Sequence, residues 1–366
     1  EVDLELGPHH VRPEMLSSLT FATDATGATL AHPVSLLMTG TLDPDDEGLQ
    51  PDFDTNVFLR DEHGTWERVT VFRGEGGLKA GSARAGRVYR DRVTGVDRVF
   101  ISLGSAGILS GVYDPSERGS IRWDAESESG TLDCWPLAIV EVDDSLLFAA
   151  GNRVYRRTDG DRPAWTVVYE MDGEVQSDEG LAGTIFTALG GIRGLTRIDN
   201  PAGNGDSLLF VWTAAVEDPG FVYRLDPDGQ GGFTRHEEAC IADAACYHLA
   251  MDATDFVIGG YNEMTAAIDP HTGKTLHLFG FETAFEGVRQ RFPTRRAFRS
   301  KGLYAGAMYG VRRADGSYHW GEVNGLAIDH QLPLIAPRAF AVSPFDADGG
   351  QVIYFGGFDT NFRSTS

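Results

Sequence analysis

A unit of strand-like segments recurs along the chain, and this repeat constrains the fold more than any other feature. Each unit has a short apolar segment that ends in a small residue, a second strand-like segment, a turn containing Gly, and an aromatic residue on the returning segment. The unit appears in residues 145–168, 208–233 and 303–320. A repeat of this kind indicates a chain built from one supersecondary unit used many times.

The apolar segment of this unit can be found seven times. Its anchor residues are Leu36, Val99, Leu146, Leu208, Phe256, Leu303 and Val352, with successive spacings of 63, 47, 62, 48, 47 and 49 residues. The spacings of 63 and 62 residues contain insertions, so the repeat period of the other four spacings is kept. Another apolar segment precedes each anchor, which makes about four short strands per unit, bounded by Gly, Asp, Asn and Pro turns. Four-stranded units of about 40–50 residues are typical of β-propeller blades.

The sequence therefore predicts an all-β fold, in which residues 1–366 form a single domain. That domain is a seven-bladed β-propeller of four-stranded antiparallel blades. The last anchor lies close to residue 366, so its blade lacks outer strands. The alternating segment Val2–Leu6 is expected to supply one of them. Pairing of the N- and C-terminal strands would close the ring and protect an open sheet edge.

Aromatic and glycine residues fit this architecture. Four of the tryptophans occupy the same place in the unit, on the returning segment after the turn: Trp66, Trp123, Trp165 and Trp320. Repeated placement predicts that they pack between blades. The chain contains 45 glycines in 366 residues. Tight hairpins explain that excess, because their turns need residues with positive φ.

Composition excludes several classes of protein. The net charge is −23, from 54 acidic and 31 basic residues, and 42% of the chain is hydrophobic. Enough apolar residues for a core exclude a disordered chain. An acidic chain lacks the basic surface that nucleic-acid backbones require, and no apolar run reaches the ~18 residues of a membrane span. We expect a monomer that binds a small molecule, with no nucleic-acid and no membrane partner.

Three cysteines bear on the compartment: Cys134, Cys240 and Cys246. A disulfide between Cys240 and Cys246 would imply an oxidising, secreted or periplasmic location. The alternative is a pair of small buried residues, and both interpretations remain open. The opening segment Glu1–Leu6 is not a signal peptide, although an export signal removed earlier remains open as well.

Topology locates a candidate site at the mouth of the central channel. In each blade the start of the inner strand and the end of the second strand lie on the same face, so residues at those positions converge there. The candidate substrate-binding residues are Arg193, Arg295, Arg338, Trp135, Tyr261 and Tyr309. Arginines from several blades can clamp an anionic group through forked hydrogen bonds. The alternative is that they point sideways and pair with acids between blades.

Two of the residues at this mouth are candidates for catalysis. His248 and Glu263 bracket the first hairpin of the fifth blade, and a His–carboxylate pair can perform general acid–base chemistry. The cofactor is unknown, but a divalent metal ion, calcium or a transition metal, fits the same group, with ligands His248, Asn262, Glu263 and Asp359. A partly buried, hydrogen-bonded imidazole is the structural alternative for His248. His277 is assigned to an outer hairpin and left out of the site.

An acidic insertion follows the first anchor strand. Asp43–Gly48 and Asp54 place acids at positions one, three, five and twelve, with Gly at six, which resembles a calcium-binding loop. No flanking helices are expected and Pro51 lies inside, so a solvated acidic loop between the second and third strands of the first blade is favoured.

The function remains open between two classes. The sequence lacks the Gly-x-Ser-x-Gly elbow, the phosphate-binding loop and the dinucleotide fingerprint. The favoured hypothesis is an enzyme of lyase or hydrolase type that acts on a polar or anionic small molecule at the funnel mouth, with metal assistance as an option. The alternative is a noncatalytic propeller that binds a ligand or a protein on that face.

Overall fold

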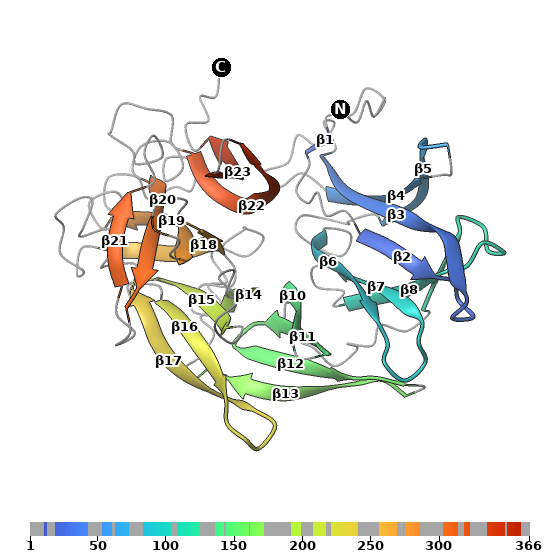
Figure 1. Cartoon of the computed structure of the whole chain (residues 1–366), viewed down its shortest axis with the longest axis horizontal. Coiled ribbons are helices and arrows are strands. Elements are labelled where there is room, and N and C mark those ends of the chain that lie inside the picture. The colour runs from blue at the N-terminus through green and yellow to red at the C-terminus, as the bar shows by residue number, and fades with distance from the viewer. Residues whose placement is uncertain are drawn as a thin grey trace. The chain divides into compact units, whose positions relative to one another are not determined.

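The computed structural model describes antiparallel β-structure in most repeat units. The described residues are 11–12, 19–42, 53–60, 63–72, 83–103, 108–124, 136–142, 144–160, 162–171, 192–198, 208–216, 221–240, 256–268, 272, 275–285, 303–313, 318–322, 335–347 and 350–359. The regular elements in these ranges are strands without exception, and every strand pair is antiparallel. The all-β prediction is therefore confirmed (Figure 1).

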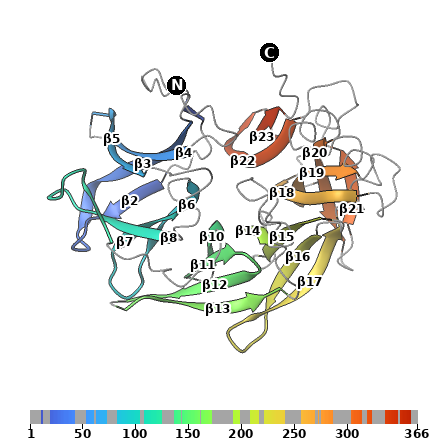
Figure 2. The ribbon, with the colours of Figure 1, turned by 180° about the vertical axis from the view of Figure 1, so that it is seen from behind.

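The chain forms two compact units, Glu1–Asp172 with Ser177–Ala188, and Gly173–Gln176 with Leu189–Ser366. The strands of the first unit are β1 (Val11–Arg12), β2 (Leu19–Thr23), β3 (Thr29–Leu42), β4 (Phe53–Arg60), β5 (Trp66–Phe72), β6 (Ala83–Arg90), β7 (Asp97–Leu103), β8 (Ile108–Tyr113), β9 (Ile121–Trp123), β10 (Pro136–Val142), β11 (Ser145–Ala150), β12 (Arg153–Thr158) and β13 (Ala164–Glu170). Sets β6–β9 and β10–β13 each form a four-stranded sheet in chain order, and β2–β5 follow the same order in a sheet whose fifth strand is β1, which pairs with β3 (Figures 1 and 2).

The strands of the second unit are β14 (Ile192–Ile198), β15 (Leu208–Val216), β16 (Phe221–Pro227), β17 (Phe233–Cys240), β18 (Phe256–Ile268), β19 (Thr275–Phe285), β20 (Leu303–Arg312), β21 (Tyr318–Glu322), β22 (Ile335–Ala347) and β23 (Gly350–Asp359). Sets β14–β17 and β18–β21 follow the same four-strand order, and pairing of β15 with β18 joins them into one sheet. Strands β22 and β23 form a hairpin. Successive four-stranded antiparallel sheets are the blades of a β-propeller.

Two details of the pairing differ from the sequence-based expectation. The anchors Phe256 and Leu303, expected in separate blades, lie in one sheet, because the 11-residue strand β19 pairs with β18 on one edge and β20 on the other. Near the N-terminus, Val11 and Arg12 pair with Thr41 and Gly40 of β3. Segment Val2–Leu6 lies outside the described residues, so seven blades, ring closure and the single domain stay predictions.

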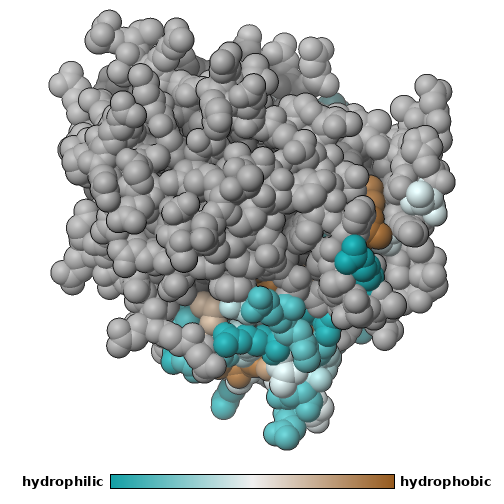
Figure 3. Space-filling view, turned by 90° about the vertical axis from the view of Figure 1, so that its left-hand side faces the viewer, coloured by the Kyte–Doolittle hydropathy of each residue, from teal (hydrophilic) through white to brown (hydrophobic). Residues whose placement is uncertain are grey.

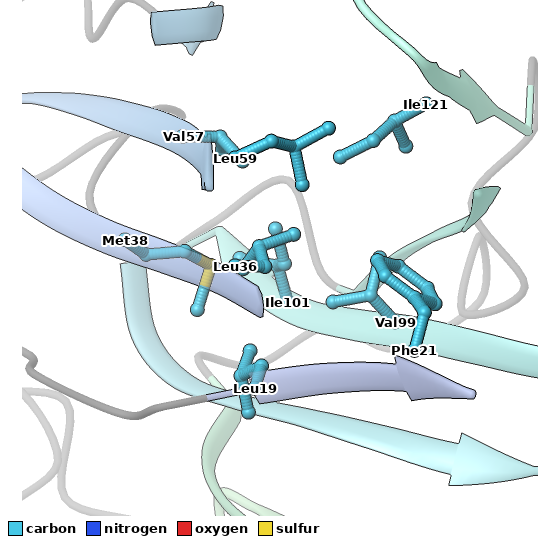
Figure 4. Packing of buried hydrophobic residues seen from close by; sticks show 9 residues of the cluster. All are labelled: Leu19, Phe21, Leu36, Met38, Val57, Leu59, Val99, Ile101 and Ile121. Carbon is cyan, nitrogen blue, oxygen red and sulfur yellow. The ribbon is translucent and has the colours of Figure 1, made fainter. Parts of the chain in front are cut away.

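Apolar residues from neighbouring sheets fill the space between them. Strand β2 alternates buried and exposed residues, as a strand covered on one side does. The first core cluster joins sheet β2–β5 to sheet β6–β9 and contains Leu19, Phe21, Leu36, Met38, Val57, Leu59, Val99, Ile101 and Ile121 (Figure 4). A second cluster, including Phe100 and Phe148, joins β6–β9 to β10–β13. Each sheet of the first unit is thus stabilised by its neighbour.

The tryptophans lie where the repeat predicted, on the fourth strands β5, β9, β13 and β21. Two of them bridge adjacent sheets. The indole nitrogen of Trp123 donates a hydrogen bond to Thr70 Oγ1 at 3.1 Å on β5, and the Trp165 ring meets Phe100 of β7 edge to face. Gly111 lies opposite Trp123, and a Cβ there would come within 2.7 Å of the indole ring. A glycine is therefore required for this packing.

A buried ion pair also joins two sheets of the first unit. Arg157 of β12 donates to Asp91 Oδ2 at 2.9 Å and to Asp159 Oδ1 at 2.6 Å, and the side chains of Arg157 and Asp91 are both 1% exposed. The guanidinium also lies 5.2 Å from the centroid of the Phe100 ring, within cation–π range. Asp91 therefore links the turn after β6 to the sheet β10–β13.

The environment of Asp91 favours its ionised form. Burial alone would raise the pKa of this carboxyl, but hydrogen bonds from the Thr94 and Gly160 amides and the charge of Arg157 outweigh burial and lower the pKa to about 2. Burial and the hydrogen bond to Asp159 raise the pKa of Tyr89, so its hydroxyl stays protonated 2.7 Å from Asp159 Oδ2. Asp91 therefore stays ionised over the physiological pH range.

Replacing Arg157 with Ala should lower the free energy of unfolding by about 3–5 kcal/mol, because the Asp91 carboxylate would remain buried without its partner. Arg153→Ala is the matched control, since Arg153 forms an exposed pair with Glu170 on the same sheet, and its cost should stay below about 1 kcal/mol. Urea unfolding of both variants measures the difference. Losses of equal size would contradict the assignment of Arg157 as a sheet-joining residue.

The lowered pKa of Asp91 predicts an acid-dependent contribution to stability. A carboxyl with a lowered folded-state pKa stabilises the fold above its unfolded pKa of about 3.9, and this stabilisation is lost as the pH falls toward about 2. In Asp91→Asn the free energy of unfolding should therefore fall less steeply between about pH 4 and pH 2 than in the unmodified chain. Parallel pH profiles for the two proteins would be inconsistent with this role.

Candidate functional site

The start of an inner strand lies opposite the end of the second strand, as the sequence argument requires. In the second unit, Ile192 at the start of β14 pairs with Thr213 near the end of β15, and Gly194 pairs with Trp212. In the first unit, Pro136 at the start of β10 pairs with Ala150, the last residue of β11. The strand ends used to choose the candidate residues are therefore adjacent within their sheets.

A β-bulge recurs at this end of the inner strands. The register shifts between Pro136 and Ala138 in β10, between Ile192 and Gly194 in β14, and between Pro337 and Ala339 in β22. Within the second unit, Arg193 and Arg338 therefore occupy equivalent bulged positions. Bulges change the direction of a side chain and are enriched beside active sites. The repeated position is a backbone feature that sets these two candidates apart from ordinary strand residues.

A sequence signal for the bulge exists, although the search for channel residues missed it. Proline has no N–H for the ladder and is confined in sheets to edges, strand starts and bulges. Pro136 and Pro337 directly precede the extra residue in their strands. Strand β6 has a longer shift between Ala83 and Gly86, where the Ala85 amide donates to Ser102 Oγ at 2.8 Å. That buried hydroxyl satisfies an amide released by the irregularity.

Strand β18 carries three of the predicted residues and has a bulge of its own. Tyr261 pairs with Phe281 and Glu263 with Gly280, so Asn262 is the extra residue between them. Tyr309 lies on β20, in register with Leu278 of β19. Asp359 ends β23 and pairs with Ile335 at the start of β22, three residues before Arg338.

The strands that carry these residues surround β18. Strand β18 contacts β14, β22 and β23, and β22 also contacts β19 and β20. The strands that carry the described candidate residues are therefore packed together in the second unit, as strand contacts and register show. These residues are Arg193, Tyr261, Asn262, Glu263, Tyr309, Arg338 and Asp359.

His277 contradicts its assignment to an outer hairpin. It lies within β19, is 4% exposed, and its ring meets the Phe210 ring edge to face at 5.5 Å and 77°. The error has a physical cause: the imidazole packs in the same way as an aromatic core residue, between β15 and β19.

Several predicted residues lie outside the described ranges, and their predictions are untested. These are His248, Arg295, Trp135, Cys134, Cys246 and the acidic segment Asp43–Gly48. Asp54 lies at the start of β4, so the acidic segment does connect the second and third strands of the first sheet. Among the described residues, no three His, Cys, Asp or Glu side chains are grouped to hold a metal ion.

The outer hairpin β16–β17 shows a different use of charge. Arg224 holds Asp226 through two hydrogen bonds of 2.7 and 2.8 Å, and His236 Nε2 lies 3.2 Å from the same carboxylate. Strand β17, which carries Arg235 and Glu237, ends the order of its sheet. Charged residues on an edge strand oppose pairing with another chain. The lower part of Figure 3, where this hairpin faces the viewer, is mainly hydrophilic.

Comparison with known proteins identifies no family. No protein-family model matches the chain, and no curated protein matches it. Solved structures similar to it include the periplasmic gluconolactonase of Pseudomonas aeruginosa, at 12% identity over 88% of this chain and 75% of the other, with a TM-score of 0.46. Hydrazine synthase of Kuenenia stuttgartiensis is 12% identical over 84% and 70%, with a TM-score of 0.44.

The β-propeller domain of Nup133 from Vanderwaltozyma polyspora is 8% identical over 95% and 84% of the two chains, with a TM-score of 0.42. Likenesses at this level say nothing about the activity, substrate or partners of this chain. In the part of the chain that the structure describes, no helix has the length and hydropathy to span a membrane.

Proposed function

We propose that the chain is an enzyme of hydrolase or lyase type, with its site on the strands around β18 in the second unit. The observation that carries this proposal is the packing of β14, β22 and β23 against β18. These four strands hold the candidate carboxylate Glu263 and the bulged Arg193 and Arg338. A carboxylate near two equivalent arginine positions suits a polar substrate with an acidic group.

The chemistry divides between binding and proton transfer. Arginine presents a planar fork of donors that fits a carboxylate with two parallel hydrogen bonds. Arg193 and Arg338 bind the acidic group of the substrate, with Arg295 as a third candidate. Glu263 then serves as the general base, with His248 as its partner. Tyr261, Tyr309 and Trp135 supply aromatic surface for the rest of the substrate.

Metal assistance is an optional part of this proposal. His248, Asn262, Glu263 and Asp359 combine one nitrogen ligand with oxygen ligands, a set compatible with calcium or a transition metal. A bound ion would polarise a substrate oxygen or lower the pKa of a bound water. Metal content of the purified chain, before and after His248→Ala, tests this part separately.

A noncatalytic ligand-binding protein remains the second candidate, because β-propellers host both functions. The bulged arginines favour it as much as they favour an enzyme, since binding an acidic ligand needs no proton transfer. We propose that the chain is a monomer and that its partner is a small molecule. Neither nucleic acid nor a membrane is proposed as a partner.

Glu263→Gln should lower kcat by at least ~100-fold on any carboxylate-bearing ester, lactone or acetal that the chain turns over, because the amide cannot accept the proton. Glu237→Gln on the exposed strand β17 is the control, and its kcat should be unchanged. Arg338→Ala should mainly raise KM, and Arg338→Lys should restore little of it. Binding of the same compounds without turnover by the unmodified chain would favour the ligand-binding protein.

We also propose that the blades number seven and that the N-terminal segment completes the last one. Removing residues 1–10, which leaves the pairing of Val11 and Arg12 with β3 in place, should then lower Tm by many degrees, since an edge of the last sheet would lose its partner. Scanning calorimetry of the shortened and full chains measures this change. A shift below about 2 °C, which corresponds to roughly 1.5 kcal/mol for a chain of 366 residues, would contradict the closure.

A further inference from the structure

A second β-bulge recurs in the outermost strands of three sheets, between the third and the fourth strand of each set. The register shifts there by one residue on the fourth strand. The extra residues are Val69 in β5, Val168 in β13 and Glu238 in β17. The residues opposite them on the third strands are Val57–Phe58, Val154–Tyr155 and Val222–Tyr223. This outer bulge therefore occupies one equivalent position of the repeat, opposite a valine followed by an aromatic residue.

The three bulged strands end the order of their sheets, so each has an edge that pairs with no other strand among the described residues. An open edge presents a row of N–H and C=O groups with which a strand of another chain can pair. A bulge interrupts that row, because its extra residue stays unpaired and the strand bends and twists more strongly there. A straight strand can therefore pair with only part of such an edge.

Strand β13 is the one whose sequence most favours pairing with another chain. Its segment Trp165–Tyr169 consists of aromatic and β-branched residues and contains no charge, Pro or Gly. Segments of this composition pair readily into cross-β assemblies. Val167, next to the extra residue, is 46% exposed although it is a large hydrophobic residue. Strands β5 and β17, by contrast, include charged residues near their centres, which oppose edge pairing as well.

The described fourth strands without this bulge have other features that weaken their edges. Strand β9 is 3 residues long, and a very short edge strand offers few groups for pairing. Strand β21 keeps a regular register with β20 and contains Gly321, a residue that weakens a strand. Within residues 165–169 of β13, the bulge is the feature that opposes pairing with another strand.

We propose that the bulge at Val168 keeps the edge of sheet β10–β13 from pairing with β13 of a second copy of this chain. The second copy is the partner that this edge fits, because a twofold axis places the same edge of two identical chains side by side. The outer bulge is therefore a device that keeps the chain monomeric. This role goes beyond the proposed activity and is the same for an enzyme and for a ligand-binding protein.

Deletion of Val168 from the full chain tests the proposal. Val167 and Tyr169 pair with the adjacent residues Tyr155 and Val154, so the deletion removes the bulge and leaves the other pairs of the two strands in register. The weight-average mass in analytical ultracentrifugation should then rise ~2-fold as dimers form. Val168→Ala is the matched control, because it keeps the extra residue, and it should remain monomeric.

A charge on the same edge should reverse the effect of the deletion. In the deletion variant, Val167→Lys should restore the monomer, since a charged side chain on an edge strand opposes pairing. Far-UV circular dichroism of each variant separates edge pairing from loss of folding. A deletion variant that keeps its β-spectrum and stays monomeric would overturn the proposal, as would a dimer that Val167→Lys leaves intact.

A peptide with the sequence of residues 164–170 gives a test that does not depend on the deletion variant. Fluorescence anisotropy of the labelled peptide should show no binding to the edge of the unmodified chain, because the bulge interrupts it. The deletion variant should bind the peptide saturably. Saturable binding to the unmodified chain that Val167→Lys abolishes would show an edge open to pairing and would contradict the proposal, even if the deletion variant did not fold.

Discussion

Each four-stranded sheet of this chain has two faces that must be covered, and the rest of the structure depends on that constraint. In the first unit, the core between β2–β5 and β6–β9 and the core between β6–β9 and β10–β13 use both faces of the middle sheet. Polar groups between sheets then gain from pairing, since the low dielectric there makes an unpaired group costly. Arg157 and Asp91 are paired in this way, as is the indole of Trp123 with Thr70.

The same constraint positions the candidate site. Sheets that cover one another leave little exposed face, so function falls on strand ends and on irregularities near them. The recurring bulge is such an irregularity, and in the second unit it holds Arg193 and Arg338. Polar residues at such irregularities need a partner or a ligand when they are buried.

The repeat allowed much of the fold to be predicted from the sequence. Anchor strands, four-strand order and the fourth-strand tryptophans follow from spacing and turn chemistry, both local properties. The joint sheet β14–β21 could not be found in this way, since nothing local marks the pairing of β15 with β18 that joins its two halves. For the site, strand ends pointed to Arg193 and Arg338, but the burial of His277 against Phe210 depends on packing between β15 and β19, which only the folded chain shows.

A crystal structure of the chain grown with a small carboxylate tests the central claim most directly. The account predicts the carboxylate bound by Arg193 or Arg338 on the bulges of β14 and β22, the strands that pack against the β18 strand of Glu263. Arginines paired instead with acids of neighbouring strands, with the carboxylate absent from this region at saturating concentration, would contradict it.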